Sequence, residues 1–185
     1  EEEVLPETAR RLRAKLEALM AADRIASASR VLLVNDGSRD RTWETIEALH
    51  RDCALFSGVN LTRNRGHQNA LLAGLMTAKD RCDMAISMDA DLQDDINAVD
   101  AMLDQYYAGC DIVYGVRSSR EKDTFFKRFT AEGFYRVMNK LGAETVFNHA
   151  DYRLMSRRAL EGLAQFKEVN LFLRGIVPMI GYRTG

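Results

Sequence analysis

The sequence predicts an α/β fold in which a mostly parallel sheet carries helices on both of its faces. Two observations support this fold class. Short apolar runs bounded by turn residues alternate with segments of helical periodicity over the first 115 residues, in the order strand–helix–strand–helix–strand–helix–strand. The 185 residues, 46% hydrophobic and 29% charged, are typical of one globular domain with a sizeable core.

The first helix and the first strand are read from apolar spacing. Residues 7–22 place Leu12, Leu16 and Leu19 on one helical stripe, with basic side chains on the other face. The apolar run at 31–34 then ends in the turn-forming letters NDGS. Four β-favouring residues bounded by a turn are typical of a buried parallel strand.

A second helix and strand follow, and then a helix of unusual composition. The second helix turns Trp43, Ile46 and Leu49 inward, and the next strand is expected at 58–61. A helix opens at Gly66 with the letters HQNALLAGLMTAK, which are rich in alanine and glycine. Small side chains let a helix approach a sheet closely, so this face is expected to pack on the sheet.

The remaining elements show where the alternation ends. We expect a third strand at 84–88, a helix at 95–108 and a fourth strand at 111–114. Residues 116–124 are polar and charged, so the regular rhythm stops there. The later expected elements are a helix at 125–141, a short strand at 152–155 and a helix over the letters SRRALEGLAQF.

Acidic residues follow two of the predicted strands. In an open parallel sheet, ligands bind beyond the carboxyl ends of the strands. Asp36 follows the first strand, and Asp89 and Asp91 follow the third. Residues 89–100 contain five aspartates and no basic residue. Such carboxylates repel one another, so a divalent cation with oxygen ligands is expected at Asp89 and Asp91, whereas Asp94 and Asp95 suit the start of the next helix.

Other kinds of site fit less well. The letters DADLQDD begin like a calcium-binding loop, but Asp94 stands where that loop requires glycine, and no phosphate-binding glycine loop is present. Three widely spaced cysteines, Cys53, Cys82 and Cys110, indicate reduced thiols rather than a disulfide framework. A hydrolase of the phosphatase kind, with an aspartate nucleophile after a strand, stays open as an alternative.

Four motifs in order carry a family resemblance: VNDGSRDRT, TRNRGHQNALLAG, MDADLQDD and HADYRLMSRRAL. They resemble the successive signatures of family 2 glycosyltransferases, and most of all those of the branch that glycosylates polyprenyl phosphates. The resemblance spans nearly the whole chain. It implies a GT-A-type α/β fold, a nucleotide-sugar donor, and Mg²⁺ or Mn²⁺ at the Asp-x-Asp motif.

The resemblance also assigns residues to the nucleotide-sugar donor. Asp36 matches the acidic residue that reads the nucleoside, and Arg63 matches the loop beside the base. Asp89 matches a residue that contacts both the donor and the metal. Family members begin with a strand ending in Pro-x-Tyr-Asn-Glu, and Glu1 is expected to be what remains of that motif.

Metal ligands and a base are implied in the same way. Asp89 and Asp91 match the metal-binding pair, and Gln93 matches an additional ligand of the polyprenyl branch. Asp151 in HADYRL matches the proposed catalytic base. A phosphate acceptor is largely a dianion at neutral pH and needs little help from a base, so Asp151 is either a base or a positioning residue.

A basic segment is the expected acceptor site. Residues 117–128 hold five basic side chains against two acidic ones, and Arg117 and Arg128 match the residues that grip the acceptor phosphate. Arginine suits a phosphate because its planar fork donates two parallel hydrogen bonds. The chain as a whole has 26 basic and 27 acidic residues, so its charge does not indicate a nucleic-acid partner.

The expected function is a metal-dependent, inverting transfer of sugar from a nucleotide-sugar donor, UDP-glucose favoured, to a polyprenyl-phosphate lipid. The alternatives are a saccharide acceptor, the hydrolase named above, or a nucleotide-binding module without turnover. Residues 1–185 are expected to form a single catalytic domain without the family's first strand and C-terminal membrane helices. The full-length protein is expected at the cytoplasmic face of the cell membrane, as a monomer or a homo-oligomer.

Overall fold

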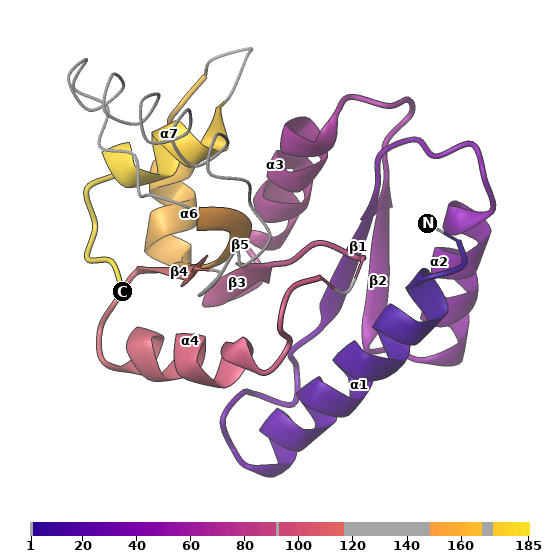
Figure 1. Ribbon diagram of the computed structural model, residues 1–185, viewed down its shortest axis with the longest axis horizontal. Helices are drawn as coiled ribbons and strands as arrows, with labels where there is room; N and C mark the ends of the chain where they lie inside the picture. The colour runs from indigo at the N-terminus through magenta and orange to yellow at the C-terminus, as the bar shows by residue number, and fades with distance from the viewer. Residues whose placement is uncertain (1, 92, 117–148, 168–171) are drawn as a thin grey trace, which may run out of the picture.

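A computed structural model describes residues 2–91, 93–116, 149–167 and 172–185 of the chain and shows an α/β fold (Figure 1). Glu1, Arg117, Arg128 and the helix expected at 125–141 lie outside the described residues. Within the described part of the chain, no helix is long and apolar enough to cross a membrane.

Every predicted element that falls on described residues is present, with ends that differ by a few residues. In chain order the elements are α1 (Leu5–Ala21), β1 (Val31–Asn35), α2 (Thr42–Asp52), β2 (Phe56–Asn60), α3 (His67–Ala78), β3 (Met84–Ser87), α4 (Ala98–Tyr107), β4 (Ile112–Val116), β5 (His149–Ser156), α6 (Arg157–Leu163) and α7 (Leu173–Met179). The short helix α7 was not predicted, because its segment reads as an apolar tail.

The described strands form two groups. β1 and β2 pair in parallel, in a register that runs from Val31 opposite Phe56 to Asn35 opposite Asn60. β5 lies between β3 and β4 and is antiparallel to both, so β3 and β4 run in the same direction. Among the described residues, β1 and β2 thus form a parallel pair, and β3 and β4 run in the same direction on either side of the antiparallel β5.

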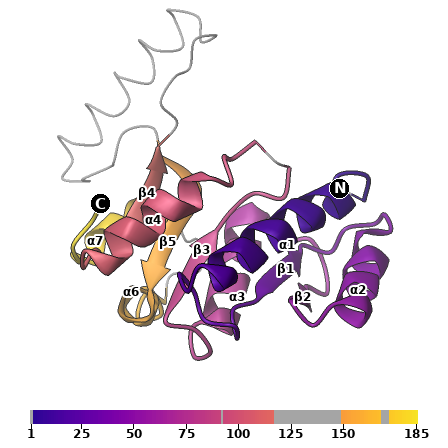
Figure 2. The same cartoon turned by 90° about the horizontal axis from the view of Figure 1, so that it is seen from below.

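Helices cover both faces, as predicted. Leu33 of β1 packs in a cluster with side chains of α1 and α2, whereas the next residue, Val34, faces α3. In β4, Val113 packs with α4, and Ile112 packs with α3, α6 and α7. Successive side chains of a strand point to opposite faces, so α1, α2 and α4 cover one face and α3, α6 and α7 cover the other (Figure 2).

The buried apolar side chains of the described residues form three clusters. One joins α1, α2, β1 and β2 through Leu5, Ala9, Leu33, Ile46, Leu55 and Phe56. The other two lie on the two faces of the β3–β5–β4 group. The core of the β1–β2 half is therefore separate from the core of the other half.

The small residues of α3 bring this helix close to the sheet. A Cβ atom added at Gly74 would lie 2.7 Å from Cγ2 of Val34, so a larger residue there would have to displace the Val34 side chain. Ala70, one turn earlier, is buried. This close packing confirms the prediction for the helix and fixes its first residue, His67, at the carboxyl edge of β1.

Candidate active site

The carboxyl ends of β1 and β3, the start of α3 and the strand β5 meet at one cavity of about 680 Å³. Asp36, His67, Asp89 and Asp151 all line it. Residues that are far apart in the sequence are thus brought together at the sheet edge where ligands bind in open parallel sheets.

Asp36 organises the loop that precedes α3. Its Oδ1 accepts a hydrogen bond from the backbone N–H of Arg65 at 2.6 Å, and its Oδ2 accepts one from Gly66 at 2.9 Å. Gly37 has a φ of +62°, and a Cβ there would lie 2.5 Å from the carbonyl carbon of Arg63. The loop after β1 and the loop before α3 therefore lie in direct contact.

Arg63 stands in that second loop with an exposed side chain. Its guanidinium makes no hydrogen bond or ion pair with any described residue. Asp36 and Gly37 contact the backbone of this loop, and the Arg63 side chain is exposed to solvent. This placement suits a residue that binds the phosphates of a ligand.

Asp89 and Asp91 extend from β3 as the sequence predicts. Asp89 is 42% exposed in its side chain, while Asp91 is exposed and accepts a hydrogen bond from the backbone N–H of Gln93 at 3.0 Å. Burial raises the pKa of Asp89, and the nearby carboxylates of Asp94, Asp91 and Asp151 raise it further, against the opposing effect of His67. The carboxylate of Asp89 thus lacks a full counter-charge among the described residues.

The donor atoms present fit a magnesium or manganese ion. Asp89, Asp91 and the exposed Gln93 offer oxygen ligands only. Among the described residues, no three His, Cys, Asp or Glu side chains come together as a metal cage. Mg²⁺ is usually held by one or two carboxylates together with substrate phosphates and water, so an open pair is the arrangement expected for it.

The neighbouring aspartates have structural partners. Asp95 accepts a hydrogen bond at 2.9 Å from the backbone N–H of Asn97, just before α4 begins. Asp94 is buried, and its Oδ2 lies 3.4 Å from the backbone nitrogen of Asp89. The acidic segment is thus divided into an exposed pair for a cation and a second pair that shapes the turn.

Asp151 is the most tightly held carboxylate of the site and is 5% exposed. Its Oδ2 accepts hydrogen bonds from Nη2 of Arg174 at 3.1 Å and from the amide of Gln68 at 3.2 Å, and lies 3.0 Å from Nε2 of His67. Its Oδ1 accepts a hydrogen bond from Nη2 of Arg153. Side chains from α3, β5 and α7 therefore converge on one buried carboxylate.

These partners settle the charge state of Asp151. Burial alone would raise the pKa of its carboxyl group, but the hydrogen bond from Arg174 and the charges of Arg153 and Arg174 outweigh burial and lower the pKa. The carboxylate is therefore ionised at neutral pH. A carboxylate with a lowered pKa holds a proton poorly, which makes it a weak general base.

Arg153 is the buried counter-charge of Asp151. It is 1% exposed, and its Nε and Nη1 atoms have no hydrogen-bond partner among the described residues. Burial lowers the pKa of the guanidinium, while Asp151 opposes this effect. A buried arginine with unpaired donors depends strongly on its one carboxylate partner.

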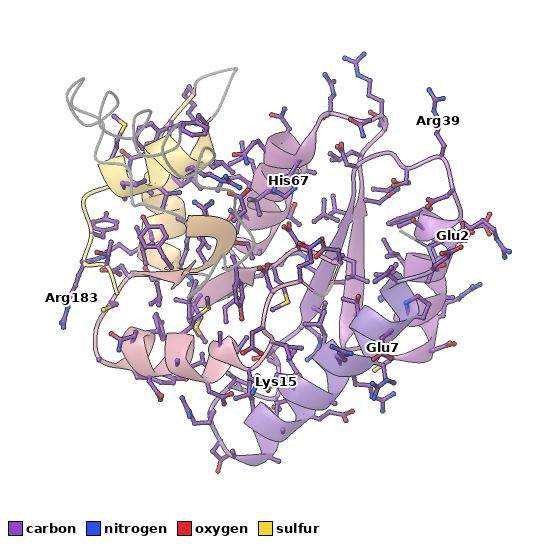
Figure 3. All side chains as sticks on the ribbon, in the orientation of Figure 1. Glu2, Glu7, Lys15, Arg39, His67 and Arg183 are labelled. Carbon is purple, nitrogen blue, oxygen red and sulfur yellow. The ribbon has the colours of Figure 1, made fainter. Side chains whose placement is uncertain are left out.

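His67, at the start of α3 (Figure 3), lies near both Asp89 and Asp151. Its Nε2 lies 3.0 Å from Asp151 and 4.0 Å from Oδ1 of Asp89, and the side chain is 54% exposed. Neither His67 nor Arg174 was predicted as a site residue from the sequence. The available signals were the position of His67 directly after Gly66 and the single charge of Arg174 in that tail.

The sequence profile of the family "Glycosyl transferase family 2" matches residues 1–163. The chain belongs to glycosyltransferase family 2. Among its relatives, the uncharacterised glycosyltransferase YkoT of Bacillus subtilis is 54% identical over 184 residues, covering 100% of this chain and 55% of that protein. The bactoprenol glucosyl transferase of Shigella phage SfV is 39% identical over 155 residues, covering 83% of this chain and 50% of that protein.

A solved structure supports the fold of this family 2 chain. The mannosyltransferase PcManGT of Pyrobaculum calidifontis, in complex with GDP-Man and Mn²⁺, superposes with a TM-score of 0.57 at 18% identity, covering 100% of this chain and 50% of that chain. The expected GT-A-like fold is thereby confirmed. The chain spans about half the length of the relatives it matches.

Proposed function

We propose that the protein transfers a sugar from a nucleotide-sugar donor to the phosphate of a polyprenyl lipid. One observation carries the proposal: the exposed acidic pair after β3 lies at the same sheet edge as the loop of Asp36 and Arg63 and the cluster around Asp151. A donor diphosphate needs a cation and a loop that binds its nucleoside, and this edge holds carboxylates suited to the first and a loop suited to the second. Membership of family 2 supports this reading.

The proposed donor site divides its tasks among six residues and a metal. Asp89 and Asp91, with Gln93, would hold Mg²⁺ or Mn²⁺, and this ion supplies charge stabilisation for the departing nucleoside diphosphate. Asp36 fixes the loop in which Arg63 faces the diphosphate, and the remaining acceptor capacity of Asp36 suits a nucleoside N–H or hydroxyl. Glu1 remains a proposed contact of the nucleoside.

Asp151 is proposed to position the site rather than to remove a proton. Its lowered pKa, its burial and its two arginine partners all oppose the role of a base. A phosphate dianion attacks the anomeric carbon without losing a proton, so an inverting displacement with this acceptor needs no base. Asp151 would instead hold His67 and Arg174 at the reaction centre.

Two observations support a lipid phosphate as the proposed acceptor. Relatives at 39% identity are named bactoprenol glucosyl transferases, and bactoprenol is a polyprenyl lipid. The basic segment at 117–128, with Arg117 and Arg128, offers the charge that an acceptor phosphate needs. Glucose from UDP-glucose is the favoured donor for the same reason, and the site would lie at the cytoplasmic face of a membrane.

A thermal-shift panel tests the donor half of the proposal. With Mn²⁺, UDP-glucose at about 100 times its Kd is expected to raise Tm by roughly 5 °C or more, because the donor binds only the folded state. GDP-mannose, and UDP-glucose with EDTA, are expected to give smaller shifts. The variant Asp91→Ala should lose the effect of the metal, and an unchanged metal-dependent shift in this variant would contradict the assignment.

A further inference from the structure

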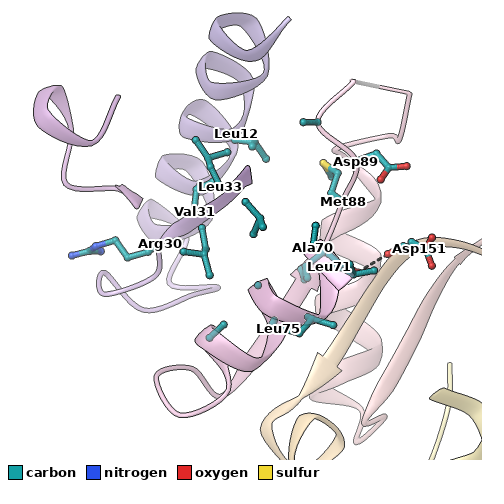
Figure 4. A pocket seen from close by; sticks show the side chains of 18 of the residues that line it. Leu12, Arg30, Val31, Leu33, Ala70, Leu71, Leu75, Met88, Asp89 and Asp151 are labelled. Atoms are coloured by element: carbon teal, nitrogen blue, oxygen red, sulfur yellow. Dashed lines mark hydrogen bonds between the residues drawn. The ribbon is translucent and has the colours of Figure 1, made fainter. Parts of the chain in front are cut away.

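We propose that Gln68 is a positioning residue of the active site, whose side-chain amide ties the first turn of α7 to Asp151 and so holds Arg174 against that carboxylate. The inference rests on the proposed function only in placing Asp151 at the reaction centre. Figure 4 shows Asp151 among the residues that line the cavity, beside α3, the helix that also carries Ala70 and Leu71. Gln68 belongs to the first turn of this helix.

The side-chain amide of Gln68 uses both of its ends. Its Nε2 donates a hydrogen bond to Oδ2 of Asp151 at 3.2 Å, and its Oε1 accepts one from the backbone N–H of Leu173 at 3.1 Å. An ionised carboxylate only accepts and a backbone N–H only donates, so the two partners determine the orientation of the amide. Gln68 therefore links β5 and α7 through one rigid, planar group.

Helix α7 needs the hydrogen bond that Gln68 accepts. The first N–H groups of a helix have no partner within the helix and are usually satisfied by a polar side chain at the N-cap. Phe172 stands at the N-cap of α7, and its ring offers no oxygen to these groups. Gln68, 105 residues earlier in the chain, supplies the acceptor for the N–H of Leu173 instead.

The first turn of α7 also carries Arg174. Its Nη2 donates to Oδ2 of Asp151 at 3.1 Å, and its Nε lies 3.4 Å from Oδ1. Leu173, directly before it, is 1% exposed and belongs to the same apolar cluster as Leu75 of α3. The side chain of Arg174 is 44% exposed, so its place on the carboxylate depends on how the first turn of α7 is held.

Helix α3 is a suitable anchor for this turn because the sheet fixes its position. Ala70 is buried, and Gly74 lets the helix approach Val34 of β1 closely. His67 and Gln68, in the first turn of the same helix, both reach Oδ2 of Asp151. Gln68 thus carries the position of α3 to α7 through its two hydrogen bonds.

The amide makes these contacts without adding charge to the site. Asp151 already has Arg153 and Arg174 as cationic partners. Replacing Gln68 by Met, an unbranched side chain of similar size, removes two hydrogen bonds and leaves the net charge around Asp151 unaltered. A change of turnover in Gln68→Met therefore reports a change of geometry.

Hydrogen exchange tests the tie directly, in the full-length protein and without substrate. In Gln68→Met, the amide of Leu173 is expected to exchange at least about tenfold faster than in the unsubstituted protein, because its acceptor is gone. The Nε–H of Arg174, followed by NMR, is expected to exchange about fivefold faster as its contact with Asp151 loosens.

The matched control is Ser156→Ala, which removes the cap of a neighbouring helix. Ser156 caps α6, a helix of the same length as α7, by accepting a hydrogen bond from the backbone N–H of Ala159 at 3.1 Å. Loss of this cap should speed exchange at Ala159. The amide of Leu173 and the Nε–H of Arg174 should stay within about twofold of their original rates.

Steady-state kinetics of sugar transfer measure the functional consequence. Gln68→Met should lower kcat about fivefold and leave KM for the donor within about twofold, because its hydrogen bonds run to Asp151 and Leu173 rather than to the donor residues. Ser156→Ala should keep both constants within about twofold of their original values.

The proposal is overturned if Gln68→Met leaves the exchange of Leu173 and Arg174 unaltered, or if it lowers kcat no more than Ser156→Ala does. A raised donor KM with an unchanged kcat would also overturn it, since that result describes donor binding. If the unsubstituted protein transfers no sugar to a polyprenyl phosphate, the proposed function fails instead. The exchange rates need no acceptor, so they would still decide whether Gln68 holds α7 and Arg174.

Discussion

At the scale of single residues, Asp151 and its two arginines are the most consequential contacts of the site. Replacing Asp151 by Asn leaves Arg153 buried without a carboxylate, which is expected to cost roughly 3 kcal/mol of unfolding free energy. We expect turnover by the folded variant to fall only about tenfold, because Asp151 is proposed to position other side chains. The loss of a general base would lower turnover by about 10²–10⁴-fold. Urea unfolding and steady-state kinetics measure the two effects.

A second variant separates the charge of Asp151 from its shape. Asp151→Asn combined with Arg153→Met removes both buried charges, so we expect it to regain at least about half of the lost stability. A loss of turnover beyond about 10³-fold in Asp151→Asn, with the stability unchanged, would instead identify Asp151 as the base.

The pKa of Asp89 is raised, whereas that of Asp151 is lowered. Its raised pKa means that the folded state binds a proton more readily than the unfolded state, so its charge destabilises the fold at neutral pH. This destabilisation disappears as the pH falls through the raised pKa. In metal-free protein, Asp89→Asn should therefore raise Tm at pH 7 by on the order of 1 °C, a small effect because the side chain is half-exposed and screened.

Asp91→Asn is the matched control for Asp89→Asn. Asp91 is exposed, so the same change there should leave Tm at pH 7 nearly unaltered, as scanning calorimetry would show. Both variants should lose the metal-dependent part of donor binding. A lower Tm for Asp89→Asn in metal-free protein would show that its carboxylate stabilises the fold, contrary to this account.

The sequence predicted the acidic half of the site but not the residues that hold it. Asp36 and Asp89 were found because each follows an apolar run, and parallel strands bring their carboxyl ends to one edge. His67 and Arg174 approach Asp151 from positions 84 and 23 residues away in the chain. No local periodicity reports such distant contacts, so they emerged only from the fold.

At the scale of elements, the contact between α3 and β1 depends on Gly74. A Cβ atom there would lie 2.7 Å from Val34, so Gly74→Ala should destabilise the protein by about 1–2 kcal/mol, even though alanine favours the helix by about 1 kcal/mol. Adding Val34→Ala should recover part of the loss, as urea unfolding would show. If Gly74→Ala alone proved stabilising, the close packing of α3 on β1 would be refuted.

The sequence patterns predicted the positions of the strands better than their pairing. β1 and β3 were placed correctly because their apolar runs end in turn residues. β2 begins at Phe56, two residues before the expected start at Gly58, because the buried Phe56 pairs with Val31 of β1, a contact between strands that the local pattern does not report. The run that forms β5 was recognised, but nothing in a short apolar segment states its partners, so its antiparallel position between β3 and β4 could not be predicted.

At the scale of the whole molecule, the divided core predicts uneven local stability. β5 is central to its group and carries Leu154 and Met155, both fully buried, whereas β1 borders the cavity. In the 185-residue chain, we expect the amides of β1 to exchange at least about tenfold faster than those of β5. Native-state hydrogen exchange measures this, and equal rates in the two strands would contradict a divided core.

The chain belongs to glycosyltransferase family 2, and we propose that it is the catalytic part of a metal-dependent enzyme that acts on a polyprenyl phosphate. The most direct measurement is sugar transfer by the full-length protein, with labelled UDP-glucose and a polyprenyl phosphate in detergent, followed by separation of the lipid products. The account predicts a glucosylated lipid phosphate in Mg²⁺ or Mn²⁺, lost on addition of EDTA and in Asp91→Ala. Release of free glucose or phosphate at an unchanged rate without the lipid, or transfer unaffected by EDTA, would contradict it.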